Sequence, residues 1–231
     1  MGIATPVIHR YLAQIQAKVG VKLLQTSPQG TVLTADGKRL AAEYAALVER
    51  TKTSDRIVIG GTILTEDLLL GVVSHLDSEA AYDVIISDDE RNLRDFRAGL
   101  MDVIVLDDPL FAYEMADAKF EELMEDRLIH VDKGPNYLRF RYGAQRIGFR
   151  YLDGKGEKYS VSGGTRSLAA LLRSNQSFFV NESLLLRKGI KLISSTDPSV
   201  FRHEILALYS EEKEPIAWLL RELKRTAGSS G

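Results

Sequence analysis

The chain contains no cysteine, which excludes disulfide bonds, thiolate nucleophiles and cysteine zinc sites together. No apolar run approaches the roughly 18 residues of a membrane span, and the first residues lack the basic start and apolar block of a secretory signal. Walker loops, nucleophile elbows and G-x-G-x-x-G loops are also missing. We therefore expect a cytoplasmic protein that is not an enzyme, with no cofactor and no membrane partner. No metal site is expected either, because the four histidines are scattered: His9, His75, His130 and His203.

Charge is small overall but unevenly distributed. The formal net charge is -2, yet residues 1–53 hold seven Lys or Arg residues against three acidic ones. The remainder of the chain is correspondingly acidic. A basic head on an acidic body suits a head that meets nucleic-acid phosphate and a body that does not.

The first fifty residues predict a helix, a hairpin and a second helix. Thr5-Pro6 is a helix start, apolar residues recur at helical spacing up to Val19, and Gly20 is a natural stop. Apolar runs at residues 21–24 and 31–33 flank turn residues, which indicates a small hairpin. Thr34 then caps a helix running to about residue 51. A polar hinge at residues 51–55 marks the predicted boundary between a head, residues 1–53, and a body, residues 54–225.

The body alternates strands and helices. Strands are predicted at 57–60, 82–86 and 101–106, separated by helices at 65–76 and 88–98, which indicates a parallel sheet covered on both faces. A second group follows: a strand at 128–131, strand-rich irregular structure at 137–154, a helix at 165–174, a strand at 178–180, a helix at 182–188, a strand at 205–209 and a helix at 215–224. Residues 226–231 are expected to form a flexible tail.

The head resembles a known family. Residues 3–40 resemble the recognition helix, wing and linker-helix start of LysR-type and ModE-type regulators, through Gly20-Val-Lys-Leu23 and Leu33-Thr-x-x-Gly37. The sequence departs from that pattern at His9, at Gln16 where a Glu is usual, and at Thr26. The resemblance implies a partial winged helix-turn-helix, because the two helices that precede a recognition helix are expected but do not occur ahead of residue 3. It also implies pairing of two chains through the linker helix, giving a homodimer or higher oligomer.

Double-stranded DNA is accordingly an expected partner. A recognition helix needs short polar or basic side chains near its N-terminal end, and hairpin tips reach backbone phosphate. The candidate DNA contacts are Thr5, His9, Arg10, Gln14, Gln29 and Lys38. The alternative for each of them is the solvated face of an ordinary helix or turn.

The body resembles the effector domain of the same family. Arg56-Ile-Val-Ile-Gly-Gly-Thr62 and the "helix, Gly, apolar, Asp, strand" pattern around Gly99 and Asp102 are similar to its first lobe. The expected fold class is thus α/β: a two-lobed periplasmic-binding-protein-like sensor domain preceded by a partial winged helix-turn-helix and a linker helix.

Two Gly-Gly-Thr segments, one in each predicted lobe, suggest where a small-molecule effector binds. Backbone N–H groups and hydroxyls at helix N-termini hold anions and carboxylates. The candidate ligand-binding residues are Thr62, Thr65, Ser87, Ser162, Gly163, Gly164, Thr165 and Asn181. The alternative is that each segment is only a tight turn and helix cap. Asp107 and Asp108, at a strand end, would repel an anion; they either select a cationic group or cap a loop.

Three functions stay open, and one basic segment has two interpretations. The chain is a regulator sensing a small anion, a solute-binding protein without a DNA-binding role, or an enzyme on a two-lobed fold of prephenate-dehydratase or deaminase type. The enzyme hypothesis lacks a pair of close carboxylates or a cleft lysine. The basic, aromatic stretch 137–142, with Arg146 and Arg150, is either a nucleic-acid contact or a sheet edge guarded by charge.

Overall fold

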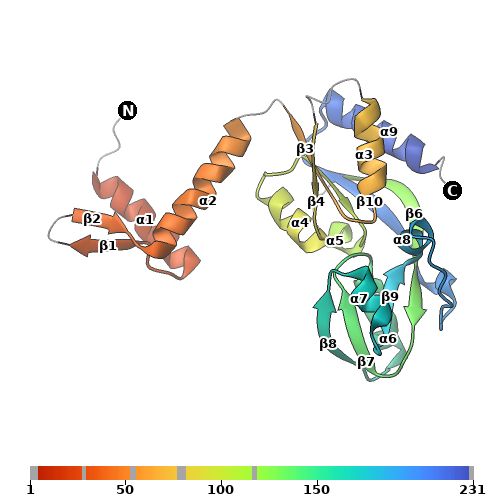
Figure 1. Cartoon of the computed structure of the whole chain (residues 1–231). Coiled ribbons are helices and arrows are strands. Elements are labelled where there is room, and N and C mark those ends of the chain that lie inside the picture. The colour runs from red at the N-terminus through yellow and green to blue at the C-terminus, as the bar shows by residue number, and fades with distance from the viewer. Residues whose placement is uncertain (1–4, 28–29, 53–55, 77–81, 116–118, 229–231) are drawn as a thin grey trace. The chain divides into compact units, whose positions relative to one another are not determined.

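The computed structural model describes residues 5–27, 30–52, 56–76, 82–115 and 119–228. The chain divides into two compact units, Met1–Ser54 and Asp55–Gly231, which are drawn together in Figure 1. Among the described residues, no helix is long and apolar enough to cross a bilayer.

Unit 1 consists of helix, hairpin and helix, as expected. Its elements are α1 (Thr5–Val19), β1 (Leu24–Ser27), β2 (Gly30–Leu33) and α2 (Ala35–Lys52), shown in red and orange in Figure 1. The antiparallel hairpin pairs Leu24 with Leu33, so its first strand begins later than the apolar run at 21–24 indicated.

Two side chains hold the elements of unit 1 together. The Gln16 side-chain oxygen accepts hydrogen bonds from the backbone N–H groups of Leu23 at 2.7 Å and Leu24 at 3.0 Å, which ties α1 to the hairpin. The Thr34 hydroxyl accepts from Gly37 N at 3.1 Å, which confirms it as the cap of α2, and donates to the Lys22 carbonyl. Gln16 therefore performs a structural role at the position where the resembled families carry Glu.

Unit 2 is built in two lobes. Lobe 1 contains β3 (Ile57–Gly61), α3 (Glu66–His75), β4 (Tyr82–Ile86), α4 (Asp89–Arg97), β5 (Val103–Leu106), α5 (Leu110–Tyr113) and α9 (Glu214–Gly228). Lobe 2 contains β7 (Asn136–Phe140), α6 (Gln145–Lys155), β8 (Ser160–Thr165), α7 (Leu168–Arg173), β9 (Phe178–Asn181), α8 (Glu182–Arg187) and the 3-10 turn Pro198–Phe201. Two long strands, β6 (Lys119–Val131) and β10 (Arg202–Tyr209), pair along the boundary.

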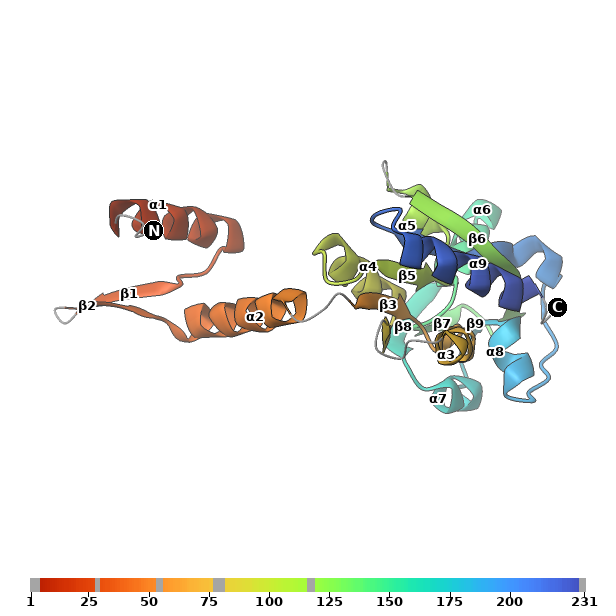
Figure 2. The same cartoon turned by 90° about the horizontal axis from the view of Figure 1, so that it is seen from above.

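One six-stranded sheet runs through both lobes in the order β4-β3-β5-β10-β6-β9. The strands β4, β3 and β5 are parallel, whereas β10 is antiparallel to both β5 and β6, and β9 is antiparallel to β6. The parallel pair β7–β8 completes lobe 2. Figure 2 views the same elements from above.

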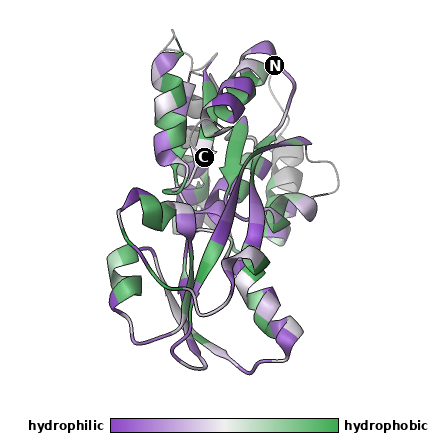
Figure 3. Cartoon of the chain, turned by 90° about the vertical axis from the view of Figure 1, so that its right-hand side faces the viewer, coloured by the Kyte–Doolittle hydropathy of each residue, from purple (hydrophilic) through white to green (hydrophobic). Residues whose placement is uncertain are grey.

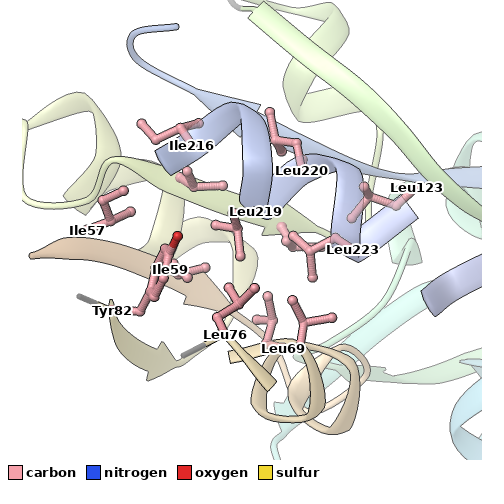
Figure 4. Packing of buried hydrophobic residues seen from close by; sticks show 14 of the residues in the cluster. Ile57, Ile59, Leu69, Leu76, Tyr82, Leu123, Ile216, Leu219, Leu220 and Leu223 are labelled. Carbon is pink, nitrogen blue, oxygen red and sulfur yellow. The ribbon is translucent and has the colours of Figure 1, made fainter. Parts of the chain in front are cut away.

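Alternation along β5 explains why helices cover both faces of the lobe 1 sheet. Val103 and Val105 face a cluster built with α3 and α9, while Ile104 and Leu106 face a second cluster built with α4 and α5. Figure 4 shows α3 and α9 supplying Leu69, Leu219 and neighbouring side chains to the first cluster. Helices in Figure 3 carry both hydrophilic and hydrophobic residues, as amphipathic helices covering a sheet do.

Several predicted elements need correction. Strand β6 starts at Lys119 rather than 128, and residues 145–155 form helix α6 instead of irregular strand structure. Residues 160–165 form strand β8, so the following helix starts only at Leu168. Helix α9 continues to Gly228 with Ala227 buried, so the expected flexible tail from 226 is wrong at its start. The remaining predicted strands and helices of the body occur within a few residues of their expected bounds.

Candidate functional site

A buried carboxylate joins the two lobes. Asp107 follows β5 and is fully buried, and one of its oxygens accepts the Thr62 hydroxyl at 2.7 Å. Its other oxygen accepts the backbone N–H of Gly143 in lobe 2 at 3.0 Å. Because Thr62 follows β3, this single side chain links the carboxyl ends of two lobe 1 strands to the loop before α6.

Further carboxyl groups surround this junction. Asp89, at the start of α4, accepts the backbone N–H groups of Asp107 (3.1 Å) and Asp108 (3.0 Å). Burial raises the pKa of Asp107 from its ordinary value of 3.8 to about 7. Burial, followed by the nearby charge of Asp107, also raises the pKa of Asp89. The junction therefore retains protons at a pH where exposed carboxyl groups are ionised.

A second polar network crosses from lobe 2 to the long strands. The Asn181 side-chain amide donates to Asp126 at 2.9 Å and lies 3.1 Å from His203 Nε2. The Asn181 side-chain oxygen accepts a hydrogen bond from Ala144 N at 3.3 Å. Since His203 Nδ1 lies 2.8 Å from the Phe201 carbonyl, the hydrogen bonds are satisfied when Nδ1 carries the proton and Nε2 accepts from Asn181.

The loop after β3 also enters lobe 2 as an apolar wedge. Leu64 is only 2% exposed and belongs to the lobe 2 core cluster, together with Phe140, Phe178 and Leu184. The Leu64 N–H donates to the Thr62 hydroxyl at 3.0 Å, which fixes the loop that carries the wedge. The lobes are thus joined by hydrophobic packing as well as by polar contacts.

The ion pairs at the edge of the junction all have the same orientation. Each places a guanidinium on lobe 2 and a carboxylate on lobe 1. The pairs are Arg139–Glu90, Arg141–Glu90, Arg166–Asp88, Arg146–Glu114, Arg150–Glu114 and Arg187–Asp67. The facing surfaces of the two lobes therefore carry opposite charge.

The predicted ligand residues of lobe 1 lie at this junction, but the hydroxyls of Thr62 and Thr65 are already engaged. Thr62 and Thr65 are fully buried, and the Thr65 hydroxyl accepts from Thr62 N at 3.1 Å. Ser87 N donates to the Gly61 carbonyl at 2.8 Å. The Gly-Gly-Thr segment of lobe 1 thus builds a turn that holds Asp107, rather than a row of free N–H groups.

In lobe 2 the expectation of a helix N-terminus at the Gly-Gly-Thr segment is wrong. Ser162, Gly163, Gly164 and Thr165 belong to strand β8, and Ser167 caps the next helix by accepting from Ala170 N at 3.2 Å. Two hydrogen bonds explain the difference, because Arg141 N donates to the Thr165 carbonyl and the Ser162 hydroxyl donates to the Tyr137 carbonyl. This segment is therefore a strand paired with β7, and the helix starts after it.

The predicted DNA contacts lie in unit 1. Thr5, His9, Arg10 and Gln14 belong to α1, where the Gln14 side chain is exposed. Lys38 is exposed in the first turn of α2. Gln29 lies outside the described residues.

Apolar side chains on both helices of unit 1 are open to solvent. Ile15 and Val19 of α1 are 40% and 47% exposed, and Tyr44 of α2 is 65% exposed. Exposed apolar side chains on a helix are available for packing against a further segment or a second chain.

Sequence reasoning missed three members of the junction. Asp126 and His203 lie in long strands beside other charged residues, and no spacing pattern marks them. Gly143 carried the one available signal, a glycine in the loop between β7 and α6: its φ is +79°, and a Cβ there would lie 1.9 Å from the Asn181 side-chain oxygen.

A surface pocket of about 300 Å³ lies elsewhere on lobe 1, between α9 and strands β6 and β10. It contains none of the predicted ligand residues; its lining is Glu121, Tyr209, Glu212, Ile216, Ala217, Leu220, Arg221 and Lys224. Among the residues that the structure describes, no group of His, Asp and Glu side chains is arranged to hold a metal ion.

Comparison with known proteins finds relatives in sequence and in fold. An uncharacterized HTH-type transcriptional regulator of Methanocaldococcus jannaschii is 27% identical over 195 residues, covering 75% of this chain and 66% of the relative. The chain thus matches about two thirds of that protein's length. No protein-family model matches the chain.

Solved structures of LysR-type regulators have the same fold. Full-length HypT from Salmonella typhimurium, a hypochlorite-specific LysR-type regulator, aligns over 98% of this chain and 90% of its own, with TM-score 0.57 and 17% identity. DarR from Vibrio fischeri, solved in complex with DNA, aligns over 97% and 90%, with TM-score 0.57 and 11% identity. The HypT regulatory domain alone aligns over 75% of this chain and 96% of its own, with TM-score 0.54 and 17% identity. The resemblance to LysR-type regulators and the two-lobed α/β fold are therefore confirmed, both for the whole chain and for the body.

Proposed function

We propose that this chain is a DNA-binding transcriptional regulator whose two-lobed unit binds a small ligand. The observation that carries the proposal is that the likeness to full-length LysR-type structures extends over 98% of the chain, and so includes unit 1 as well as unit 2. A solute-binding protein without a DNA-binding role is not favoured, because it would need only unit 2.

Unit 1 would supply the DNA contact. Its α1 is a single amphipathic helix followed by a two-stranded wing, the elements that reach the major groove and the neighbouring phosphates in winged helix-turn-helix proteins. Lys or Arg residues exceed acidic ones seven to three in residues 1–53, which favours an approach to phosphate. Two chains would pair through α2, whose Tyr44 is largely exposed.

Unit 2 would supply the sensor. Asp107 and Leu64 both connect the lobes, so a ligand that moves either side chain would change the packing of one lobe against the other. Such a ligand shifts the equilibrium only by the difference between its affinities for the two arrangements. The finer part of the proposal is that the ligand is a small anion or carboxylate. Because the two Gly-Gly-Thr segments are hydrogen-bonded within the protein, the support for an anionic ligand comes from the lobe 2 arginines.

DNA binding is tested by fluorescence anisotropy of the full chain with duplex DNA over a range of salt concentrations. Each phosphate contact contributes about 0.9 to the slope of log affinity against log salt, so Arg10→Gln should reduce that slope by about one and weaken binding at low salt. Arg225→Gln in unit 2 removes the same charge from an exposed side chain of α9 and should leave the slope unchanged. A salt-independent affinity, or equal effects of both variants, would contradict DNA binding through α1.

Ligand binding is tested by thermal unfolding against molybdate, tungstate, sulfate, amino acids and aromatic acids. A compound present at a hundred times its dissociation constant stabilises the folded state by about 2.7 kcal/mol. No stabilisation by any compound, together with tight DNA binding, would make unit 2 a pairing module instead of a sensor.

A further inference from the structure

Three arginines of lobe 2 gather where strands β7 and β8 end. Arg139 lies in β7 opposite Gly164 of β8, and Arg141 and Arg166 follow the last residues of the two strands. Because parallel strands finish at the same edge of a sheet, their guanidinium groups reach the same side of lobe 2. That side faces the start of α4 in lobe 1.

Two carboxylates of lobe 1 occupy the arginine cluster. Arg139 Nη2 lies 3.1 Å from Glu90 Oε1, and Arg141 Nη1 lies 3.6 Å from Glu90 Oε2. Arg166 pairs with Asp88. Three cations thus share two carboxylates, and each guanidinium offers five N–H donors in a planar fork.

The cluster has donor capacity that these carboxylates leave unused. Arg139 Nε is buried, and within the described parts of the chain it has no hydrogen-bond partner. A buried N–H without an acceptor costs free energy, because it has lost water without gaining a replacement. An acceptor oxygen placed beside Arg139 would remove that cost.

Glycine makes room for the cluster. A Cβ at Gly164 would lie 3.0 Å from Arg141 Nε and 3.4 Å from the Arg139 carbonyl oxygen. A side chain there would displace the Arg141 guanidinium. The Gly-Gly-Thr segment of lobe 2 therefore contributes to this site by admitting an arginine, and not through N–H groups at a helix start.

Glu90 is held weakly, whereas Asp88 is largely buried and also caps α4. The side chains of Glu90, Arg139 and Arg141 are 51%, 34% and 42% exposed, and exposed ion pairs contribute between zero and about 1 kcal/mol. An external anion with two or more acceptor oxygens competes with such pairs at little cost. It also gains bidentate, charge-assisted hydrogen bonds, which are stronger than single neutral ones.

We propose that Arg139, Arg141 and Arg166 form an oxyanion-binding site in which Glu90 of lobe 1 is an internal substitute for the ligand. The ligand class is a small molecule carrying a phosphate or carboxylate group. Its binding displaces Glu90, breaks the ion pairs of Arg139 and Arg141 with Glu90, and so loosens the lobes at this edge. This inference rests on the proposed sensor function and specifies its ligand chemistry.

The test is isothermal titration calorimetry of the full chain with inorganic phosphate and, separately, with malonate, at constant ionic strength set by sodium chloride. Arg139→Gln and Arg141→Gln should each weaken binding about tenfold, because each removes a charge-assisted hydrogen-bond partner. Glu90→Gln should tighten binding several-fold, because the internal competitor loses its charge. Arg202→Gln, which removes an arginine paired with Glu125 on the long strands, is the matched control and should bind as the unchanged chain does.

The Glu90→Gln result separates a built site from general attraction to positive charge. Removing any carboxylate makes the net charge of the chain more positive, which would slightly raise its affinity for phosphate and malonate. Glu122→Gln is therefore measured beside Glu90→Gln. Tightening in Glu90→Gln alone supports the inference, and the tighter of the two probes identifies a tetrahedral or a planar oxyanion.

Other outcomes overturn the inference. These are no binding of either probe at millimolar concentration, equal binding by Arg139→Gln and Arg202→Gln, or weaker binding by Glu90→Gln. Melting temperatures of all variants are recorded, and Arg141→Gln serves where Arg139→Gln does not fold. The proposed regulator function is judged independently by the DNA anisotropy measurement, so a chain that binds DNA but neither probe refutes only the oxyanion site.

Discussion

Replacing Asp107 with Asn should change how the stability of this protein depends on pH. The Asp107 carboxyl group is fully buried at the lobe junction, where burial raises its pKa from 3.8 to about 7. Between these two values the folded chain holds a proton that the unfolded chain has released. Stability therefore falls as pH rises through this window, with a slope of at most about 1.36 kcal/mol per pH unit for one group.

The magnitude follows from the two pKa values. Between pH 5 and pH 8 the Asp107 carboxyl should cost the unchanged chain about 2 to 3 kcal/mol of unfolding free energy. The side chain introduced by Asp107→Asn cannot ionise, so this variant should lose about 2 to 3 kcal/mol less unfolding free energy than the unchanged chain between pH 5 and pH 8. Its amide can still accept from Gly143 N and donate to the Thr62 hydroxyl, which preserves the connection between the lobes.

The assay is urea unfolding at pH 5 and pH 8, followed by the fluorescence of Trp218, the single tryptophan. Asp83→Asn, at an exposed carboxylate of lobe 1, is the control for loss of one negative charge. Equal pH dependence in Asp107→Asn and the unchanged chain would refute the argument that this carboxyl holds a proton in the folded state.

Three further substitutions, one of them with a matched control, test the packing and hydrogen bonding of the fold. Leu64→Ala should lower the unfolding free energy by about 2 to 4 kcal/mol in urea titrations, because it empties a buried site in the lobe 2 core. Gly143→Ala should cost about 2 kcal/mol or more, because the new Cβ meets Asn181, whereas Gly156→Ala has a similar positive φ with open space and should cost only about 1 kcal/mol in the same assay. Gln16→Leu should leave two backbone N–H groups of unit 1 without an acceptor, which hydrogen exchange would report as lost protection at those amides.

Local patterns in the sequence predicted most elements of the fold. The Val/Ile-rich strands β3, β4 and β5 and the Phe-rich strand β9 occur where apolar runs indicated, since such strands are marked by composition alone. Helices α3 and α4 begin with acidic residues, as the helix dipole favours. The predicted domain bounds themselves stay a prediction, although the two compact units of the structure meet at Ser54.

The errors arose where long-range contacts decide the structure. Residues 160–165 pair with β7, and nothing in their own sequence distinguishes a strand from a loop before a helix. Strand β6 was predicted too short because its first half is rich in charged residues without regular alternation, and is held by pairing with the distant β10. The candidate site shows the same limit: Thr62 and Asn181 were found at strand ends, but their partners Asp107, Asp126 and His203 come from other elements.

The proposed ligand residues follow the same division. Polar residues after strands were identified, but whether their hydroxyls face a ligand or a neighbouring carboxylate depends on tertiary packing. Arginines at 139 and 141 were interpreted as a charged sheet edge or a nucleic-acid contact, and their pairing with Glu90 becomes visible only when the lobes are assembled.

The most direct test of the regulator proposal is selection of genomic DNA fragments by the full chain, followed by sequencing of those retained. We expect enrichment of a small set of fragments, which is lost in Arg10→Gln and Gln14→Ala but kept in Arg225→Gln. Retention of all fragments in proportion to their abundance, or identical enrichment by the α1 variants, would contradict a sequence-reading role for unit 1.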